Sequence, residues 1–203
     1  STPLAHACTS ATCTAGNRQP ITSRPALARH KTQRSSTTAP NIMVFFGTGQ
    51  YLAVNDSDST LQQTFYGVWD DGSGDVTRTD LLQQTLSTDT SNGQTVRTLT
   101  DNSVDYGTQR GWYINLPTSK ERVVTNAAAI GDLVFFNTMI PSTSVCGYGG
   151  SGWLMLATQL NGGVPTFGAV RYAGLYPGID LVYSGHTGRL KREFRVAADA
   201  DPG

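Results

Sequence analysis

Charged side chains are scarce in this sequence of 203 residues. Asp, Glu, Lys and Arg supply 15% of it, against roughly 25% in ordinary soluble domains, and the formal net charge is zero. Without an excess of positive charge, the chain has no electrostatic means of attracting nucleic acid or an anionic membrane surface. Ser, Thr, Asn, Gln and Gly provide the polarity instead, which is typical of exported β-proteins.

Long apolar runs and helical periodicity are also missing. No stretch approaches the roughly 20 apolar residues of a membrane-spanning helix. Residues 1–6 lack the apolar region of a signal peptide, so we expect a segment of a longer exported protein whose signal lies outside it. Residues 79–86 are the best candidate for a short helical turn in a chain that otherwise predicts none.

Cysteine is rare, with only Cys8, Cys13 and Cys146. Cys8 and Cys13 stand five residues apart in a Ser/Thr-rich stretch, which favours a local disulfide in an oxidising compartment. Free thiols and a zinc site are the alternatives, although no second Cys or His pair lies nearby to complete a zinc cage. Cys146 is either a small buried apolar residue or the partner of a cysteine outside the segment.

The sequence is rich in short β-forming runs separated by Gly, Asn and Asp. Asn92-Gly93 favours a hairpin turn between two of them. Many short strands at such spacing indicate an all-β sandwich, barrel or propeller. The strands are predicted at 42–46, 51–54, 65–69, 81–86, 95–99, 111–115, 122–125, 133–137 and 153–157.

Two changes of composition divide the chain into three parts. Residues 1–41, rich in Ser, Thr and Pro, predict a loop or extended entry segment. Residues 42–162 hold the short strands, and residues 163–203 open a second β-domain. In this last part, apolar residues alternate with other residues on both sides of the turn 185–188. They are Ile179, Leu181 and Tyr183 before the turn, and Leu190, Phe194 and Val196 after it. This pattern predicts an antiparallel hairpin.

Two loops are rich in aspartate and are weak candidates for metal binding. Asp56 and Asp58 lie in one loop, and Asp71 and Asp75 lie in the other. Neither loop has the alternating oxygen ligands, the glycine and the distal acid of an EF-hand. We interpret both as solvent-facing turns, since Asp and Asn favour turns by local hydrogen bonding, and assign no metal to this segment.

Several charged and aromatic residues are predicted to be structural. Arg110, Glu121 and Arg122 lie within apolar motifs, where a charge needs a partner, so we expect buried or half-buried ion pairs. Trp69, Trp112 and Trp153 are expected in the core, with a carbohydrate platform as the alternative. The sequence offers no catalytic residue, because it holds no nucleophile with a base, phosphate loop or cofactor site that we can assign.

Residues 18–160 contain a series of short motifs in a fixed order. The motifs are Gln19-Pro-Ile-Thr-Ser23, Pro25 with Arg29-His30, Val44-Phe-Phe-Gly-Thr-Gly-Gln-Tyr-Leu52, Gln63-Thr-Phe-Tyr-Gly-Val-Trp-Asp70, Arg78-Thr-Asp-Leu81, Arg110-Gly-Trp-Tyr113, Glu121-Arg-Val-Val124, Pro141-Ser-Thr143 with Cys146, and Gly149-Gly-Ser-Gly-Trp-Leu-Met155. Each motif is weak alone, but in their order and approximate spacing they resemble the C-terminal β-propeller domain of the PilY family.

This resemblance implies the last blades of a quinoprotein-like propeller in a non-enzymatic protein of type IV pilus assembly and adhesion. It places the protein at the cell surface, the pilus tip or the outer membrane. Its implied partners are pilus-tip proteins, minor pilins and host or surface ligands. It implies no cofactor in this segment, with calcium possible in the parent protein. A quinoprotein-type enzyme fragment and a carbohydrate-binding β-module are the alternatives.

The tail, residues 167–203, resembles a different family. Ala169-Val-Arg-Tyr172, Leu175-Tyr-Pro-Gly-Ile-Asp-Leu-Val-Tyr183 and Arg189-Leu190 are similar to the N-terminal β-domain of secreted proteins with SBBP-type propeller repeats. The junction is compatible with a natural fusion, a truncation or a chimeric product.

Overall fold

The computed structural model is all-β, and it describes residues 2–91, 94–142, 150–164, 170–176, 179–186 and 189–196. These residues contain strands β1 to β15 and two short 3-10 helices, with no α-helix among them. The chain divides into two compact units, Ser1–Gly163 and Val164–Gly203.

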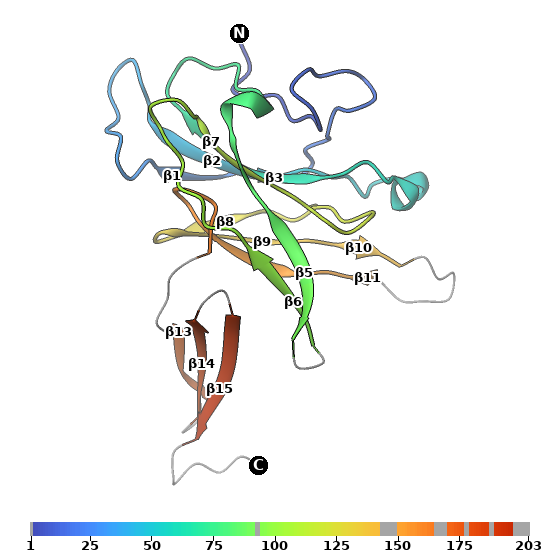
Figure 1. Cartoon of the computed structure of the whole chain (residues 1–203), viewed down its shortest axis with the longest axis vertical. Helices are drawn as coiled ribbons and strands as arrows, with labels where there is room; N and C mark the ends of the chain where they lie inside the picture. The colour runs from blue at the N-terminus through green and yellow to red at the C-terminus, as the bar shows by residue number, and fades with distance from the viewer. Residues whose placement is uncertain are drawn as a thin grey trace. The chain divides into compact units, whose positions relative to one another are not determined.

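A five-stranded sheet forms the centre of the first unit (Figure 1). Its strand order is β1-β2-β3-β7-β4, and neighbours are antiparallel except for β4, which runs parallel to β7. The strands are β1 (Ala26–Arg29), β2 (Ile42–Gly47), β3 (Thr64–Asp70), β7 (Gly111–Asn115) and β4 (Leu82–Gln84).

The other elements of this unit form a second layer and two ribbons. The second layer is the antiparallel sheet of β12 (Leu154–Thr158), β9 (Leu133–Asn137) and β8 (Ala128–Ile130). The ribbons pair β5 (Leu86–Ser91) with β6 (Gln94–Leu99), and β10 (Ile140–Pro141) with β11 (Gly150–Ser151). The 3-10 helices are η1 (Val54–Asp58) and η2 (Arg78–Asp80).

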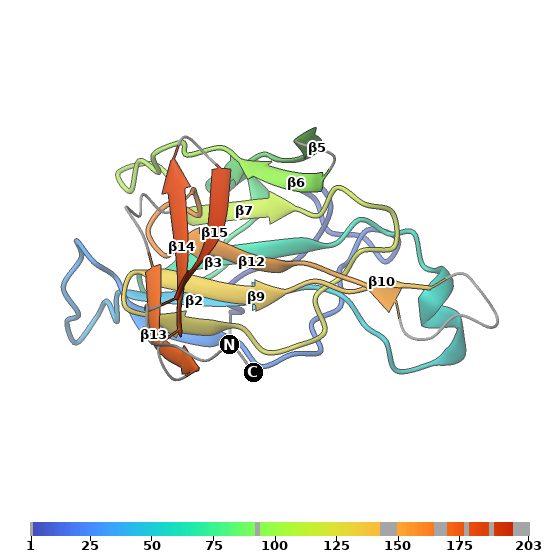
Figure 2. The ribbon, with the colours of Figure 1, turned by 90° about the horizontal axis from the view of Figure 1, so that it is seen from below.

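One face of the five-stranded sheet packs against the second sheet. Alternation along the strands points Phe65 and Trp112 into this space, and the ring of Phe65 stacks on that of Phe136 at 3.7 Å between centroids. Figures 1 and 2 show the two layers from two directions. The buried apolar residues of this core are Met43, Phe45, Phe65, Leu86, Trp112, Ile114, Leu116, Val123, Val134, Phe136, Met155 and Ala157.

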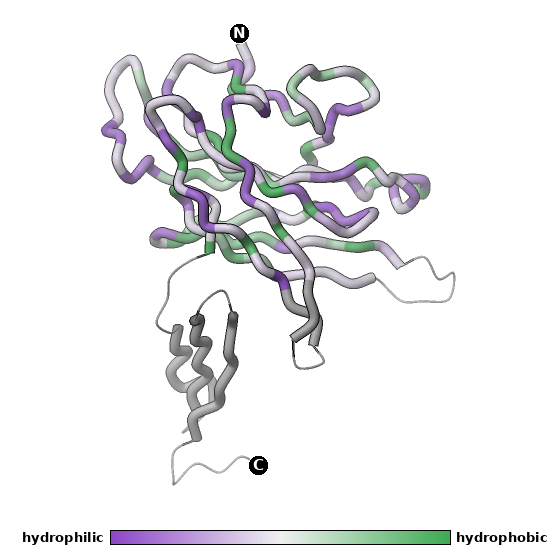
Figure 3. The backbone as a smooth tube through the Cα atoms, viewed as in Figure 1, coloured by the Kyte–Doolittle hydropathy of each residue, from purple (hydrophilic) through white to green (hydrophobic). Residues whose placement is uncertain are grey.

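The opposite face of the same sheet is also covered. Here Phe46, Tyr66, Val68 and Tyr113 form a second apolar cluster with Val76 and Leu81, and Leu4, Ala5 and Ala7 pack against it. Residues 4–7 therefore lie on the sheet and contribute to the fold. Figure 3 shows hydrophobic segments along these facing strands and hydrophilic segments in the peripheral loops.

The second unit is an antiparallel sheet of β13 (Val170–Tyr176), β14 (Ile179–His186) and β15 (Arg189–Val196). The β14–β15 pairing runs from Ile179 opposite Val196 to His186 opposite Arg189. The antiparallel hairpin predicted from alternation in this part of the chain is confirmed. The strand β13, which pairs with β14, was not expected.

Several predicted strands are confirmed, and three segments differ. The runs at 42–46, 65–69, 111–115, 133–137 and 153–157 correspond to β2, β3, β7, β9 and β12. Residues 51–54 lead into the 3-10 helix η1 because Asp56 binds the local backbone. Residues 122–125 form only an isolated bridge between Arg122 and Met139. The predicted helical turn at 79–86 is reduced to η2, since β4 follows it.

Gly67 allows a close contact between strand β3 and Trp112 in the main core. A Cβ atom at this position would lie 2.4 Å from Cε2 of Trp112. We expect Gly67→Ala to lower the free energy of unfolding by about 2 kcal/mol, because the core cannot accept the added volume. Gly16→Ala is the matched control, since its Cβ would meet nothing within 4 Å. Urea unfolding of both variants tests this, and equal stability of the two would contradict it.

Candidate functional site

The N-terminal strap, residues 4–21, is held in shape by covalent and polar contacts. Cys8 and Cys13 form a disulfide with 5.6 Å between their Cα atoms. Within the loop that this bond closes, the amide of Asn17 donates to the Ser10 hydroxyl at 2.7 Å and to the Thr12 carbonyl at 2.8 Å. The strap thus has a fixed conformation without a regular helix or strand of its own.

Arg78 joins this strap to the five-stranded sheet. Its guanidinium lies 4.4 Å from the centroid of the Tyr113 ring, a cation–π contact. Burial raises the pKa of the Tyr66 hydroxyl, which remains a donor and binds Gln19 Oε1 at 2.7 Å. The guanidinium donates to the Cys8 carbonyl (2.8 Å), Asn115 Oδ1 (2.8 Å), Thr64 Oγ1 (2.9 Å) and the Tyr66 hydroxyl (2.9 Å).

The loop that contains η1 is built around a buried carboxylate. Asp56 accepts hydrogen bonds from the backbone N–H groups of Leu52 (2.7 Å) and Ala53 (2.8 Å) and from the Gln50 side chain (2.7 Å). The two backbone N–H groups are the main reason why the pKa of Asp56 lies below its usual value. The Asp56 carboxylate therefore acts as the acceptor for backbone N–H groups that would otherwise need a carbonyl partner in a helix or sheet.

Arg122 holds the same loop by hydrogen bonds to its backbone. Within the described part of the chain, its guanidinium donates to four backbone carbonyls, those of Lys120, Gln50, Asp56 and Ser59. The residue is 3% exposed, and burial lowers the pKa of its guanidinium. Arg122 was predicted to form an ion pair, but its hydrogen bonds go to main-chain oxygens, with Asp56 nearby as the compensating charge.

Glu121 forms a buried ion pair with an arginine that sequence reasoning missed. Both carboxylate oxygens accept from Arg97 on β6, at 2.6 and 2.7 Å, and the two side chains are 0% and 4% exposed. The Arg97 guanidinium also lies 4.4 Å from the centroid of the Trp153 ring. Arg97 lies outside the motifs, so only its isolated charge in an otherwise uncharged strand could have drawn attention to it.

The loop with Asp71 and Asp75 is held by the side chains of Arg110 and His6. Arg110 pairs with the Asp71 carboxylate and donates to the Gly74 carbonyl at 2.7 Å. Asp75 accepts from His6 at 2.7 Å. The structure thus places Arg110, for which an ion pair was predicted, in an ion pair with Asp71.

The four aspartates do not fit a calcium ion. Asp56 and Asp71 already accept several hydrogen bonds. Asp58 and Asp75 are exposed, and they contact Lys120 and His6, respectively. Within the described ranges, no group of three or more His, Cys, Asp or Glu side chains could hold a metal ion.

The tryptophans lie in or against the core. Trp112 is 0% exposed, and its indole N–H donates to the Gln159 carbonyl at 3.0 Å. Trp69 and Trp153 are partly buried against the same cluster, and the indole N–H of Trp69 donates to Asn41 at 2.9 Å. Trp112 therefore cannot serve as a platform for a carbohydrate ring.

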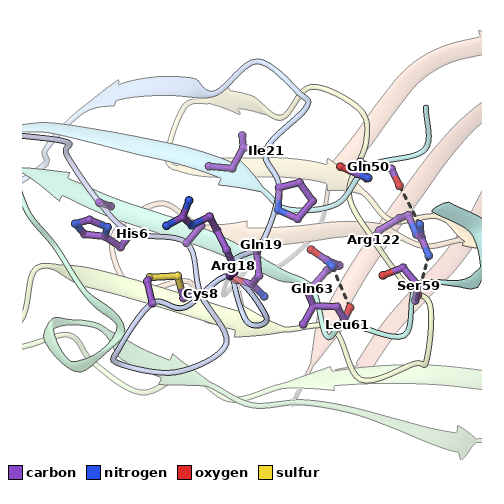
Figure 4. A pocket seen from close by; sticks show the side chains of 15 residues that line it. His6, Cys8, Arg18, Gln19, Ile21, Gln50, Ser59, Leu61, Gln63 and Arg122 are labelled. Carbon is purple, nitrogen blue, oxygen red and sulfur yellow. Dashed lines mark hydrogen bonds between the residues drawn. A yellow bond between two sulfur atoms is a disulfide. The ribbon is translucent and has the colours of Figure 1, made fainter. Parts of the chain in front are cut away.

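A surface groove of about 680 Å³ lies between the strap and the η1 loop (Figure 4). Figure 4 shows the disulfide at one side of it, Arg122 and Ser59 at the other, and Arg18 and Ile21 between them. The described residues of its lining include Gln19, Gln50 and Gln63 and no carboxylate.

His30, which belongs to the Arg29-His30 motif, is a buried histidine. It is 4% exposed, and its ring meets that of Tyr106 edge-on at 4.3 Å. Its Nδ1 accepts from the backbone N–H groups of Thr32 (3.3 Å) and Gln33 (3.2 Å). Burial lowers the pKa of His30, so the folded chain favours the neutral imidazole ring.

These features define an all-β domain in which charged side chains hold loops onto sheets. A family model described as the PilY1 β-propeller domain matches residues 3–99. The chain is 33% identical over 183 residues to the type IV pilus biogenesis factor PilY1 of Pseudomonas aeruginosa strain PAO1, which covers 78% of this chain. It is 33% identical over 156 residues, 73% of this chain, to a PilY1 homologue of Xylella fastidiosa strain Temecula1.

The crystal structure of the Pseudomonas aeruginosa PilY1 C-terminal domain is similar along the chain. The TM-score is 0.64 at 26% identity, and the match covers 99% of this chain and 48% of that one. Residues 3–99 thus match the PilY1 β-propeller domain, and the sequence relatives and the crystal structure extend this similarity over most of the chain. It spans only 15% of the Pseudomonas relative and 10% of the Xylella one.

A second family model, a domain of unknown function named DUF7948, matches residues 156–203. A change of family near the end of the chain is therefore found, while the similarity to proteins with SBBP-type repeats stays a prediction. No helix in the described part of the chain is both long and apolar enough to cross a membrane.

Removal of one partner of the buried pair should be costly. Glu121→Ala leaves the Arg97 guanidinium buried without its carboxylate, so we expect a loss of about 3 kcal/mol in the free energy of unfolding. The double variant Arg97→Met with Glu121→Leu should lose less than the single variant, because it removes both charges and retains contact with Trp153. An unchanged melting temperature for Glu121→Ala would show that the pair does not stabilise the fold.

Acid should destabilise the fold through His30. Its pKa in the folded chain lies below 6.5, so the unfolded chain binds the proton more readily, and stability falls as the pH drops below about 6.5. His30→Asn, which retains an acceptor near Nδ1, should remove this part of the pH dependence. Urea unfolding at about pH 7.5 and about pH 5 measures it, and parallel losses in both proteins would disprove the role of His30.

Proposed function

We propose that this chain is a non-enzymatic, exported segment that supports type IV pilus assembly and adhesion at the cell surface. The observation that carries the proposal is the similarity to PilY1 pilus biogenesis factors along most of the chain. Within a longer protein it supplies the last blades of a propeller, with residues 1–41 as the entry segment, 42–162 as blade strands and 163–203 as the start of a second β-domain.

Buried charged side chains have structural partners, which supports an architectural role for this segment. Arg97 with Glu121, Arg110 with Asp71, and Arg122 with backbone carbonyls are each engaged in holding loops. A catalytic acid or base needs access to a substrate, and these groups are occupied by structural partners. No observation on this chain favours the alternative of a quinoprotein-type enzyme.

The disulfide supports export, because such bonds persist in oxidising compartments such as the periplasm and the cell surface. In this proposal the partners are pilus-tip proteins or minor pilins, and host or surface ligands. Such partners bind folded surfaces, which suits a domain whose loops are held rigidly by polar contacts.

Deletion of the gene that encodes this chain in its own bacterium tests the proposal. We expect fewer surface pili and loss of twitching motility and attachment, because the pilus lacks a biogenesis factor. Sheared pilin quantified by immunoblot is the measurement, and complementation with the intact gene is the control. Normal piliation together with normal attachment in the deletion strain would rule out the proposed function. Normal piliation with lost attachment would restrict it to adhesion.

A further inference from the structure

The groove between the strap and the η1 loop has a chemistry that none of the structural roles above uses. We propose that it docks an extended, acidic peptide segment of a partner protein. The inference deepens the proposed function, on which it rests, by naming the surface and the chemistry of the partner. Its test measures binding to the purified chain, so it can fail while the piliation test succeeds.

Both walls of the groove are fixed in advance. On one side, the disulfide from Cys8 to Cys13 and the Asn17 hydrogen bonds shape the strap. On the other side, Arg122 and Asp56 hold the η1 loop through buried polar contacts. A site that is already ordered loses little conformational entropy when it binds, which favours recognition of a flexible peptide.

The positively charged residues of the groove favour a negatively charged ligand. Its lining holds Arg18 and Arg122 and no carboxylate. Arg122 is engaged with carbonyls and His6 with Asp75, whereas the exposed Arg18 side chain makes no hydrogen bond to the described part of the chain. Arg18 is therefore the available cation, and a carboxylate is its natural partner.

The lining also favours a polypeptide. Apolar surface from Ala5, Ala7, Pro20, Ile21 and Leu61 lies between the polar groups, and Ile21 is 49% exposed. An extended peptide directs alternate side chains to opposite sides, so one side can meet apolar surface while its carboxylates reach Arg18. Among the described residues that line the groove there is no Trp, Tyr or Phe, which disfavours stacking of a sugar.

Two further features support this occupant. Gln63 lines the groove and is 6% exposed, and its Oε1 has no hydrogen-bond partner among the described residues. A buried acceptor without a donor is costly, and an entering N–H group would satisfy it. The η1 loop, from which Gln50 and Ser59 line the groove, also exposes the apolar side chains of Leu52 (83%) and Val54 (90%).

The test uses a fluorescein-labelled octapeptide of alternating valine and aspartate, and the same peptide with lysine in place of aspartate. The chain of residues 1–203 is titrated into each to about 1 mM, with fluorescence anisotropy as the readout. We expect saturable binding of the aspartate peptide, about tenfold weaker binding of the lysine peptide, and a loss of affinity with added salt.

The decisive variant is Arg18→Glu, which should weaken binding of the aspartate peptide about tenfold or more. Arg34→Glu is the matched control, since Arg34 is an exposed arginine of the same N-terminal region outside the groove. Thermal melts establish that both variants fold. Absence of saturable binding, equal affinity for the two peptides, or equal effects of the two variants would each overturn the proposal.

Discussion

Burial of both faces of the five-stranded sheet is the constraint on which the rest of the first unit depends. One face is covered by the second sheet through Phe65 and Phe136, and the other by the strap and η2. A sheet that is covered on both sides leaves its connecting loops at the periphery, where they cannot be stabilised by burial of apolar surface. Those loops need polar contacts to take a defined shape.

Guanidinium groups supply many of these contacts. Arg78 ties the strap to the sheet, Arg97 holds Glu121, Arg110 holds the turn at Asp71, and Arg122 gathers the carbonyls of the η1 loop. Arginine suits this task because its planar group donates in several directions and stays charged when buried. The chain has few charged residues, and it uses several of them inside the fold.

The described part of the chain combines similarity to the PilY1 β-propeller domain with a surface groove and charged side chains that hold its loops. The segment spans a small part of its curated relatives, 15% of the one from Pseudomonas aeruginosa strain PAO1. The groove beside the disulfide is the part of that surface with an exposed cation and fixed walls, and it is the place where recognition of a partner is best supported.

The sequence by itself determined the all-β class, most strands of the first unit and the hairpin of the second, because alternation and turn residues are local signals. It also singled out Glu121 and Arg110 as charges in need of partners. Only the tertiary structure decided that Arg97 is the partner of Glu121, that Arg122 binds carbonyls, and that the strap forms one wall of a groove. These pairings join residues far apart in the chain, and no local pattern encodes which distant segment will lie beside them.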